Sequence, residues 1–510
     1  MKSEKKTLNG GQIAMAMIVL TAVSKILGFS RELLLANYYG AGTVIDAFSM
    51  AQDIPDTVFA TVIQIVGTAF LPIFSRKAEQ GDRLEADLFT SRVYNFLLSA
   101  AGVMIVLCIL FPGFFLNLFA PGFSQEAYDL SKFYLRIATF MLIGHVTIVI
   151  FEPYLRYKGS YLAPVILGFF QSIFVIGFTV LSAKTMPQYL IFGVPLGVIM
   201  QGMMLIYYAR KKAGYHYTPS FRYGNSVREV FALSLPILIS SLAVRLNAFF
   251  DRMLASGFEA GSISALRYGH LVVNLISAFS YSIVGTIVYP NFNKLAAQEK
   301  YEELGKAAHD GNHYCFMLTL PLAIGGMIFS NQIISLIYER GAFDGAATAL
   351  TAAVFFWYAL GIPFHGVSSI VAYVFYALKD IKTTVYCSLL SVAVNAVLNF
   401  VLSYLMGVEG LALATTIAAA VHMVVLLICF KRKHGNIRLF ESMKPMALTL
   451  VSAIVSVSCA YLFFMMIGNS LLHFILAVVV AVVLYLVMML LLGVVSVSMV
   501  KDMISLKKNK

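Results

Sequence analysis

Seven basic residues lie within or at the edges of the most apolar stretches of this chain. They are Lys25, Arg31, Arg92, Arg136, Arg245, Arg252 and Arg267. A charge at the centre of a bilayer costs at least about 2.5 to 3.5 kcal/mol on insertion scales, so such groups face a polar cavity or a partner. Arginine can hold a phosphate through two parallel hydrogen bonds, and lysine supplies a point charge. These residue types therefore favour a site for a large anionic ligand.

Several of these cations belong to clusters that also contain acidic or neutral polar residues. The predicted ligand-binding residues are Lys25, Arg31 and Glu32; Asp46, Asp53 and Asp56; Arg252; and Arg267, His270 and Asn274. Asp46 and Asp53 are seven residues apart and should share a helical face, as should His270 and Asn274, which are four apart. Two alternatives stay open: Arg92 and Arg136 could snorkel from helix ends, and Asp251 could form a structural ion pair with Arg245 or Arg252.

No sequence motif indicates catalysis. Walker A, HExxH, GxSxG and dinucleotide-binding patterns are all absent from the sequence. The histidines His145, His270, His313, His365 and His422 lack metal-ligand spacing, so packed or cavity-lining roles are expected. The five cysteines, Cys108, Cys315, Cys387, Cys429 and Cys459, are expected to be small buried apolar residues. We therefore predict no enzyme activity, no metal and no cofactor; energy would come from a gradient, the membrane potential or the substrate.

The composition identifies the elements that must position these residues. Of the 510 residues, 60% are hydrophobic and 12% charged, against about 45–50% and 25% in soluble proteins. This predicts an all-α polytopic membrane protein and excludes an ordinary soluble enzyme. The net charge of +12 does not indicate nucleic-acid binding, because no soluble domain remains to carry a basic face. The N-terminal apolar stretch is interrupted by Lys25 and lacks a cleavage site, which favours an uncleaved first helix.

Apolar windows of about 20 residues predict fourteen membrane-spanning helices. They lie near residues 12–38, 45–74, 92–117, 132–155, 161–182, 187–209, 229–255, 262–292, 312–335, 349–377, 384–405, 410–430, 444–467 and 471–498. The connecting segments alternate in Lys and Arg content, with 27 such residues on one side of the membrane and 3 on the other. Because cytoplasmic loops carry the basic excess, both termini are expected in the cytoplasm.

An internal repeat divides the chain. GTAFLPIFSRK from Gly67 resembles GTIVYPNFNKL from Gly285, an offset of 218, and the basic triplets from Arg210 and Lys431 are 221 residues apart. Six spans separate the copies, so both halves enter the membrane in the same direction, as in transporters with parallel repeats and a substrate site between two lobes. The predicted organisation is an N-terminal lobe (1–220), a C-terminal lobe (221–440), and two further helices with a cytoplasmic tail (441–510).

Four ordered motifs resemble those of the MurJ (MviN) family. They are SKILGFSRELLLANYYGAGTVIDAFSMAQDIP from Ser24, LIYERGAFD from Leu336, LKDIKTTV from Leu378, and NAVLNFVL with GVEGLALATTIA from Asn395. Members are lipid II flippases of the multidrug/oligosaccharidyl-lipid/polysaccharide exporter superfamily. The resemblance implies that an undecaprenyl-pyrophosphate-linked peptidoglycan precursor moves from the inner to the outer leaflet of the bacterial cytoplasmic membrane by alternating access, in support of cell-wall biogenesis and cell shape.

The same resemblance implies roles for particular residues. The family's basic pair of span 1 falls on Lys25 and Arg31, the acid that follows on Glu32, and the acid of span 2 on Asp46. A cationic cavity of the N-terminal lobe would receive the pyrophosphate, and the last two helices would line a groove for the lipid tail. The expected partners are the lipid-linked substrate and membrane lipids, with the cell-wall synthesis machinery a further candidate.

The chain departs from the family pattern at two positions. A basic residue of span 2 is replaced by Phe59, and the arginine of span 8 aligns with Leu271. Arg267 and Arg252 are the alternative substitutes for that arginine.

Three other functions remain as alternatives. One is a flippase for another lipid-linked oligosaccharide, and the second a cation-coupled multidrug antiporter of the same superfamily. The third, a membrane-embedded glycosyltransferase, would need catalytic acids on a sizeable outer loop, and the predicted outer loops are short.

Overall fold

The computed structural model describes residues 10–80, 83–220, 224–440, 442, 444–468 and 470–494, and within these ranges it contains helices and turns but no strand. The chain divides into two compact units: unit 1 is Met1–Ser264 with Arg340–Asp344, and unit 2 is Ala265–Glu339 with Gly345–Lys510. This division reflects compactness, whereas the predicted lobe boundary near residue 220 marks a sequence repeat, so the lobe assignment stays a prediction. Several predicted cytoplasmic or intramembrane cations lie outside the described residues or side chains: Lys2, Lys5, Lys6, Arg83, Arg222, Arg245, Lys501, Lys507, Lys508 and Lys510.

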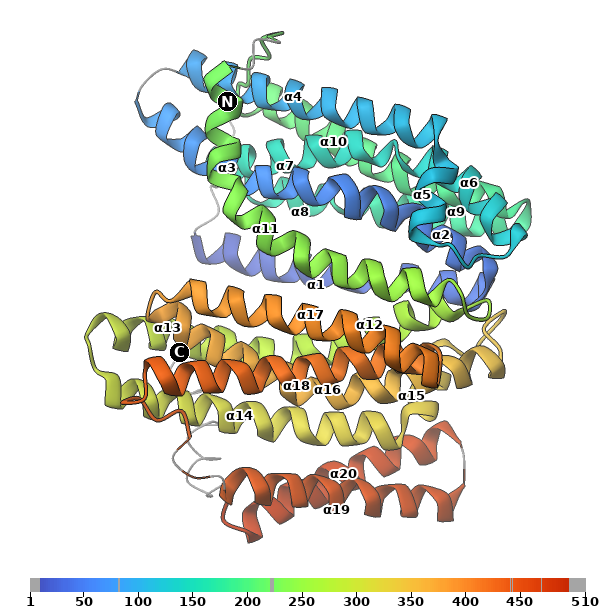
Figure 1. Cartoon of the computed structure of the whole chain (residues 1–510), viewed down its shortest axis with the longest axis vertical. Coiled ribbons are helices and arrows are strands. Elements are labelled where there is room, and N and C mark those ends of the chain that lie inside the picture. The colour runs from blue at the N-terminus through green and yellow to red at the C-terminus, as the bar shows by residue number, and fades with distance from the viewer. Residues whose placement is uncertain are drawn as a thin grey trace, which may run out of the picture. The chain divides into compact units, whose positions relative to one another are not determined.

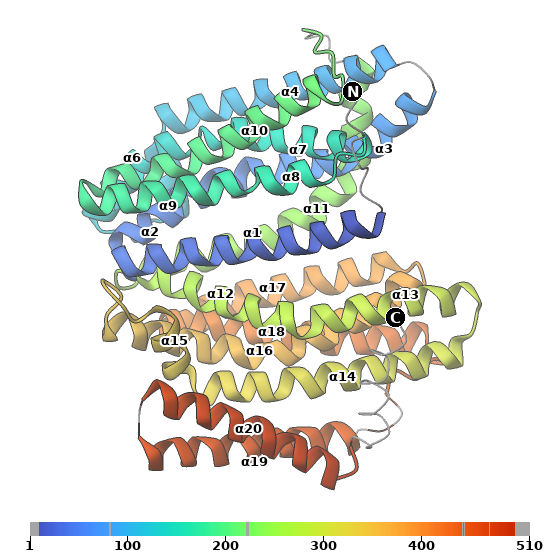
Figure 2. The same cartoon turned by 180° about the vertical axis from the view of Figure 1, so that it is seen from behind.

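Unit 1 is a bundle in which long helices run roughly alongside one another (Figures 1 and 2). Its elements are α1 (Gly10–Tyr39), α2 (Thr43–Pro55), the π-helical turn η1 (Asp56–Ala60), α3 (Thr61–Glu79), α4 (Arg83–Leu110), α5 (Pro112–Phe119), α6 (Gln125–Ala138), α7 (Met141–Tyr157), α8 (Leu162–Leu167), α9 (Phe169–Lys184), the 3₁₀ turn η2 (Pro187–Phe192), α10 (Gly193–Lys211) and α11 (Gly224–Ala255). Helix α10 packs against α7 and α9, and α3 contacts α4, α7 and α11.

The π-helical turn interrupts the helix formed by α2 and α3. It follows Pro55, which has no backbone N–H and so disturbs the regular hydrogen-bond ladder. The Thr61 hydroxyl donates a hydrogen bond of 3.1 Å to the Asp56 carbonyl, which stabilises the irregular turn. Turns of this kind occur frequently at functional sites, because they redirect side chains within a helix.

The segment after α10 folds back along one face of α4. Ser91 Oγ lies 2.8 Å from the Tyr215 hydroxyl and accepts a hydrogen bond from the Thr218 N–H. The buried Asp87 carboxylate accepts hydrogen bonds from the His216 N–H and the Tyr154 hydroxyl. Burial raises the pKa of Tyr215, so its hydroxyl remains a donor at physiological pH. The connection between α10 and α11 is therefore tied to the helix bundle.

Unit 2 contains α12 (Ser262–Phe279, whose first residues belong to unit 1), α13 (Tyr281–Ala297), α14 (Tyr301–Ile328), α15 (Ser330–Tyr338), α16 (Gly345–Ala377), α17 (Ile381–Met406), α18 (Val408–Lys433), α19 (Lys444–Ile467) and α20 (Leu471–Leu491). Helix α16 is central, since α13, α14, α15, α17 and α18 all pack against it. Its Gly366 lies against Cys315, where a Cβ would meet the sulfur at 2.5 Å. Helices α19 and α20 pack against each other, and α19 against α14.

The helical membrane architecture predicted from composition is confirmed. Among the described residues, ten helices are long and apolar enough to cross a membrane, or up to twelve if the bent pairs α6–α7 and α14–α15 each count as one span. Helices α1 and α11 are not among these twelve, but they lie where two further spans are expected, and both carry charged residues. The count of fourteen stays a prediction.

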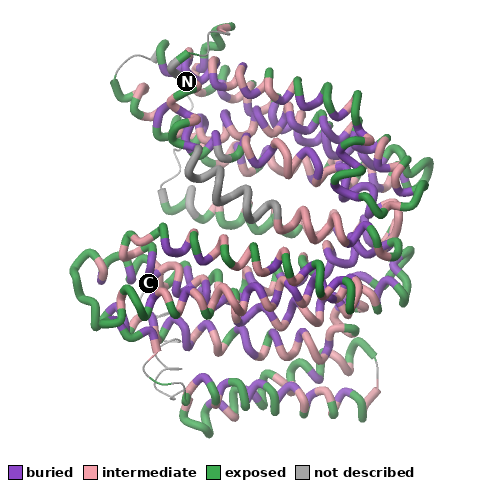
Figure 3. The backbone as a smooth tube through the Cα atoms, viewed as in Figure 1, coloured by how far each residue is buried: buried purple, intermediate pink, exposed green. Residues whose placement is uncertain are grey.

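Many apolar residues of α19 and α20 are exposed (Figure 3). A helix that faces hydrocarbon has no need to bury its apolar residues within the protein. This explains one wrong expectation about the cysteines. Cys108, Cys315 and Cys387 are buried, but Cys429 is only partly buried and Cys459 is exposed on α19.

Candidate functional site

The cations predicted on α1 differ in their surroundings. Arg31 donates hydrogen bonds from Nε (3.1 Å) and Nη2 (2.7 Å) to the same carboxylate oxygen of Glu32. The Glu32 side chain is only 4% exposed, whereas that of Arg31 is 23% exposed. Lys25 is exposed and makes no hydrogen bond or ion pair with the described residues. The helix thus presents one free cation and one cation that is already neutralised.

Asp46 caps the start of α12 within unit 1. Its carboxylate accepts hydrogen bonds from the Gly261 N–H at 2.7 Å and the Ser264 N–H at 2.8 Å, and from the Ser264 hydroxyl. A carboxylate is favourable here because the first N–H groups of a helix lack partners inside the helix and carry a partial positive charge. With Asp46 4% exposed, its oxygens are used by protein donors. Asp46 therefore fastens the α1–α2 region to the first turn of α12.

A close backbone contact lies beside this cap. The Ala342 N–H donates a 2.8 Å hydrogen bond to the Asn37 carbonyl. Gly341 has φ of +62°, and a Cβ at this position would lie 2.2 Å from that same carbonyl oxygen. Only glycine fits this approach without displacement of the backbone.

Asp53 forms an ion pair with Arg252 of α11, with 2.8 Å between Oδ1 and Nη1. The two side chains are 21% and 36% exposed, so the pair is accessible from one side. No local sequence pattern could reveal this pairing, because the two residues are 199 positions apart in the chain. The only ion pair that the sequence suggested for Arg252 was with its neighbour Asp251.

Asp56 opens η1 and faces His145 of α7, with 3.5 Å between Oδ1 and Nδ1. Sequence reasoning treated His145 as one of several scattered histidines. Its spacing carries no signal, because the contact depends on how α7 packs against η1.

The three residues predicted in unit 2 lie on α12. His270 and Asn274 are exposed, and their Nδ1 and Nδ2 atoms are 3.3 Å apart, in agreement with the four-residue spacing. The His270 ring lies 5.7 Å from that of Tyr358 on α16. Arg267 is partly exposed one turn earlier. A ligand role for these three residues stays a prediction.

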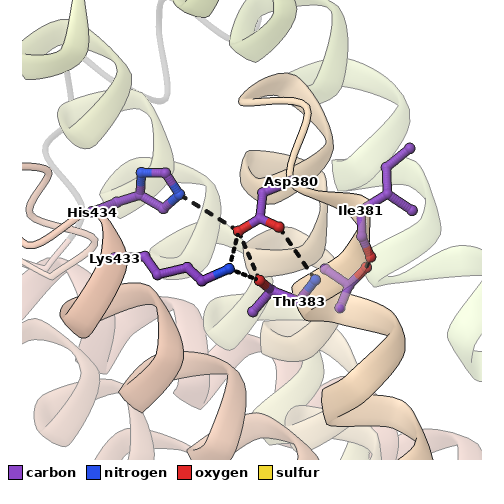
Figure 4. A network of polar contacts seen from close by, with 6 residues as sticks. Asp380, Ile381, Thr383, Lys433 and His434 are labelled. Carbon is purple, nitrogen blue, oxygen red and sulfur yellow. Dashed lines mark hydrogen bonds and ion pairs between the residues drawn. The ribbon is translucent and has the colours of Figure 1, made fainter.

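A separate polar network joins the beginning of α17 to the end of α18 (Figure 4). Asp380 accepts hydrogen bonds from the Thr383 hydroxyl at 2.7 Å and from Lys433 Nζ at 3.0 Å. Burial acts to raise the pKa of Asp380, but the hydrogen bonds from Thr383 and Lys433 outweigh it and hold the pKa below its usual value. Burial lowers the pKa of His434, and the nearby Asp380 carboxylate partly opposes this effect.

Two grooves are associated with these helices. The groove between α3 and α7 in unit 1 has a volume of about 370 Å³, and its polar lining residues include Gln64, Glu152 and Arg156. The groove between α16 and α18 in unit 2 has a volume of about 400 Å³ and is almost wholly apolar. The described residues contain no group of three or more His, Cys, Asp or Glu side chains that could hold a metal ion.

The chain is similar in sequence to one protein family over most of its length. A family profile described as "Lipid II flippase MurJ" matches residues 35–505. A protein of Rickettsia prowazekii (strain Madrid E) named "Probable lipid II flippase MurJ" is 27% identical over 458 residues, which cover 86% of this chain and 88% of that protein. A protein of Thermotoga maritima with the same name is 25% identical, with 84% and 86% covered.

Solved structures share the fold. A lipid II flippase MurJ in an inward closed conformation superposes with a TM-score of 0.80 at 24% identity, covering 92% of this chain and 97% of that one. An inward-facing multidrug transporter of the MATE family gives a TM-score of 0.64 at 13% identity, with 82% and 96% covered.

Proposed function

The chain belongs to the lipid II flippase MurJ family, and from this premise we propose that it moves lipid II from the inner to the outer leaflet of the cytoplasmic membrane. The cargo is the undecaprenyl-pyrophosphate-linked peptidoglycan precursor, and the mechanism is alternating access. The family consists of multi-pass membrane transporters rather than enzymes. Within this framework, the charged residues of unit 1 are the proposed head-group site.

The observation that carries the proposal is the arrangement of cations on α1 and α11. Lys25 is free of protein partners in the described chain, whereas Arg31 and Arg252 are each held by one carboxylate. Both arginine side chains remain partly exposed, so an incoming pyrophosphate can share or replace Glu32 and Asp53 as their partner. Arginine suits this exchange because it binds carboxylate and phosphate in the same bidentate geometry.

We propose that Asp46 acts in the conformational change and does not contact the phosphate directly. Its carboxylate is occupied by the backbone N–H groups of Gly261 and Ser264. Release of this cap would free the start of α12 from the α1–α2 region and leave the N–H groups of Gly261 and Ser264 without this acceptor. We therefore assign Asp46 to a latch that opens and closes during alternating access.

The topology and the remaining residues complete the proposal. Both termini are cytoplasmic, on the basis of the asymmetry of basic residues in the loops. The chain forms an N-terminal lobe, a C-terminal lobe and a final helix pair, α19 and α20, that lines the groove for the lipid tail. Asp56 is a further proposed head-group contact in unit 1, and His270 and Asn274 are separate candidate ligand contacts in unit 2.

The decisive test is depletion of the protein in its native organism, with measurement of lipid II in each leaflet. We expect lipid II to accumulate in the inner leaflet after depletion. If lipid II reaches the outer leaflet at the normal rate in a strain without a second flippase, the proposal is wrong. If a different lipid-linked oligosaccharide accumulates instead, the protein is a flippase for that oligosaccharide.

A second test addresses the arginine missing from span 8. If Arg267 substitutes for it, Arg267→Ala should fail to support growth in the depleted strain. Normal growth would assign the substitution to Arg252 or to no residue at all. Immunoblots of membrane fractions provide the control for expression and insertion.

A further inference from the structure

One titratable pair in unit 1 combines a carboxylate and an imidazole. Asp56 Oδ1 and His145 Nδ1 lie 3.5 Å apart, on η1 and α7. The His145 Nδ1 atom is shielded from solvent and makes no hydrogen bond with any described residue. The Asp56 side chain is nevertheless 40% exposed, so the pair has one accessible side. These two groups are placed to share a proton.

The charge of the pair depends on that proton. With an imidazolium, the pair is neutral; with a neutral imidazole, it carries one negative charge. In a membrane interior a negative charge so close to the head-group site opposes an incoming pyrophosphate, because Coulomb interactions are poorly screened there. We propose that Asp56 and His145 form a proton-binding site, and that binding of the anionic head group is accompanied by uptake of a proton at this site. This inference rests on the proposed function for the identity of the anion.

The other charged groups near the pair are already matched. On α2, Asp53 is bound to Arg252 of α11, and Asp251 lies next to that arginine. On α7, Glu152 pairs with Arg156, two to three turns beyond His145.

Where the structure describes contacts of the other packed elements with α7, neutral groups make them. On α4, Tyr94 lies 3.2 Å from the hydroxyl of Thr147. On α10, Val198 lies close to the backbone of Gly144, and α8 carries no titratable residue. The side chain of Arg245 on α11 lies outside the described part of the chain.

The groove between α3 and α7 approaches the pair along α7 and ends about one turn short of it. Its lining begins one turn beyond His145, at Ile148 and Val149, and continues to Glu152 and Arg156 at the end of α7. On the opposite wall, α3 contributes Gln64. Residues at positions i, i+4, i+7 and i+11 share a helix face, so His145 lies in line with Glu152 and Arg156. The groove therefore leads from the end of α7, which the loop charges assign to the cytoplasmic side, to within one turn of His145.

The test measures proton uptake on binding by the full-length protein in detergent. A short-chain lipid II analogue is titrated calorimetrically at several pH values in two buffers of different ionisation enthalpy, HEPES and Tris. We expect uptake of up to about one proton by the wild type, and a fall in affinity of up to about tenfold per pH unit as the pair loses its proton. His145→Gln and Asp56→Asn should remove most of this uptake. His473→Gln, on α20, is the matched control and should behave as the wild type.

The outcomes separate this inference from the proposed function. Binding by His145→Gln with unchanged proton uptake overturns the proton site and leaves the flippase proposal intact. Absence of binding by the wild type contradicts the proposed function instead. In that case, selective ¹⁵N-histidine NMR of the substrate-free protein still tests the pair. The midpoint of the His145 titration should move in Asp56→Asn and stay in place in His473→Gln; an unchanged midpoint in Asp56→Asn overturns the proton site.

Discussion

Unit 1 and unit 2 use polar residues in different ways, although both are bundles of long apolar helices. In unit 1, ionisable groups are paired inside the predicted spans, as in Asp53 with Arg252 and Asp56 with His145. The ion pairs described in unit 2 lie near helix ends, and Asp380 with Lys433 is an example. Charges inside a span are expensive and persist where they serve a function. The comparison therefore supports the proposal that unit 1 binds the anionic head group.

The two copies of the internal repeat also differ at the ends of two equivalent helices, α10 in unit 1 and α18 in unit 2. We refer to these two helix ends as the repeat corners. An offset of 221 residues matches Lys212 with Lys433, and Gly159 with Asp380. Lys433 binds the Asp380 carboxylate, whereas Lys212 lies over the Tyr208 ring at 4.9 Å. The glycine at position 159 offers no carboxylate. A repeat can therefore conserve the position of a cation while its partner changes.

The largest expected effect comes from Arg31. Arg31→Ala removes the bidentate donor of the proposed head-group site and leaves the buried Glu32 carboxylate without this partner. We expect lipid II translocation to fall at least about 100-fold, which corresponds to about 2.7 kcal/mol in the barrier, and growth of the depleted strain to fail. Arg92→Ala is the control, because Arg92 binds only Ser220 through a 3.3 Å hydrogen bond in the described structure. Equal tolerance of both variants would remove the case for an anion site in unit 1.

The next effect concerns the latch at Asp46. Asp46→Ala leaves the N–H groups of Gly261 and Ser264 without their acceptor, at a cost of at least about 2 kcal/mol. We expect a lower thermal unfolding midpoint in detergent and a slower translocation rate. Asp46→Asn should retain part of both properties, since asparagine also caps helices well. Asp129→Asn, on the exposed face of α6, should change neither property, and a similar loss in that control would show that the effect is not specific to the cap.

A smaller effect should distinguish the intramembrane pair from an exposed one. A double-mutant cycle of Asp53→Ala and Arg252→Ala should give a coupling energy of about 1 to 3 kcal/mol, because the two groups are in contact. The same cycle for Arg76 and Glu229, which join α3 to α11 with more exposed side chains, should give less than about 1 kcal/mol. Unfolding midpoints of the four variants of each cycle provide the measurement. Equal coupling energies in both cycles would mean that ion pairs inside the predicted spans are no stronger than exposed ion pairs near helix ends.

The sequence predicted what depends on local spacing and composition. Apolar windows located most of the observed helices, and the four-residue spacing predicted the contact between His270 and Asn274. Contacts made by packing were not predictable in the same way. Asp53 and Arg252 meet because α2 and α11 approach each other, and no periodicity within either helix encodes that approach. The same is true of His145, which resembled any other apolar-segment histidine until α7 was placed beside η1.

The cap that Asp46 forms on α12 is another contact that the sequence alone could not predict. The resemblance assigned Asp46 to the binding site by its position in a motif, but the structure fills its carboxylate with N–H groups from Gly261 and Ser264. Two of the three donors to this carboxylate are backbone N–H groups, which no motif reveals because every residue except proline carries one. The cap that Asp46 forms could therefore be predicted only once the start of α12 had been located.

The smallest expected effect lies at the repeated corner and depends on pH. Lys433→Ala should destabilise the protein at neutral pH by up to about 1 kcal/mol, because Lys433 is 54% exposed and its ion pair is screened by solvent. Lys212→Ala removes only a ring contact and should have a smaller effect. The pKa of Asp380 is lower in the folded protein, so its stabilisation is present above the ordinary aspartate pKa of 3.8 and is lost as the pH falls through the folded value.

The penalty of Lys433→Ala relative to the wild type should therefore shrink in acid, while that of Lys212→Ala should not follow this trend. Thermal unfolding midpoints in detergent between about pH 3 and 7, below and above the ordinary aspartate pKa, measure both. Parallel pH profiles for the two variants would mean that the carboxylate contributes nothing. The two corners would then be equivalent in energy as well as in sequence, and the contrast between the units would rest on the span interiors alone.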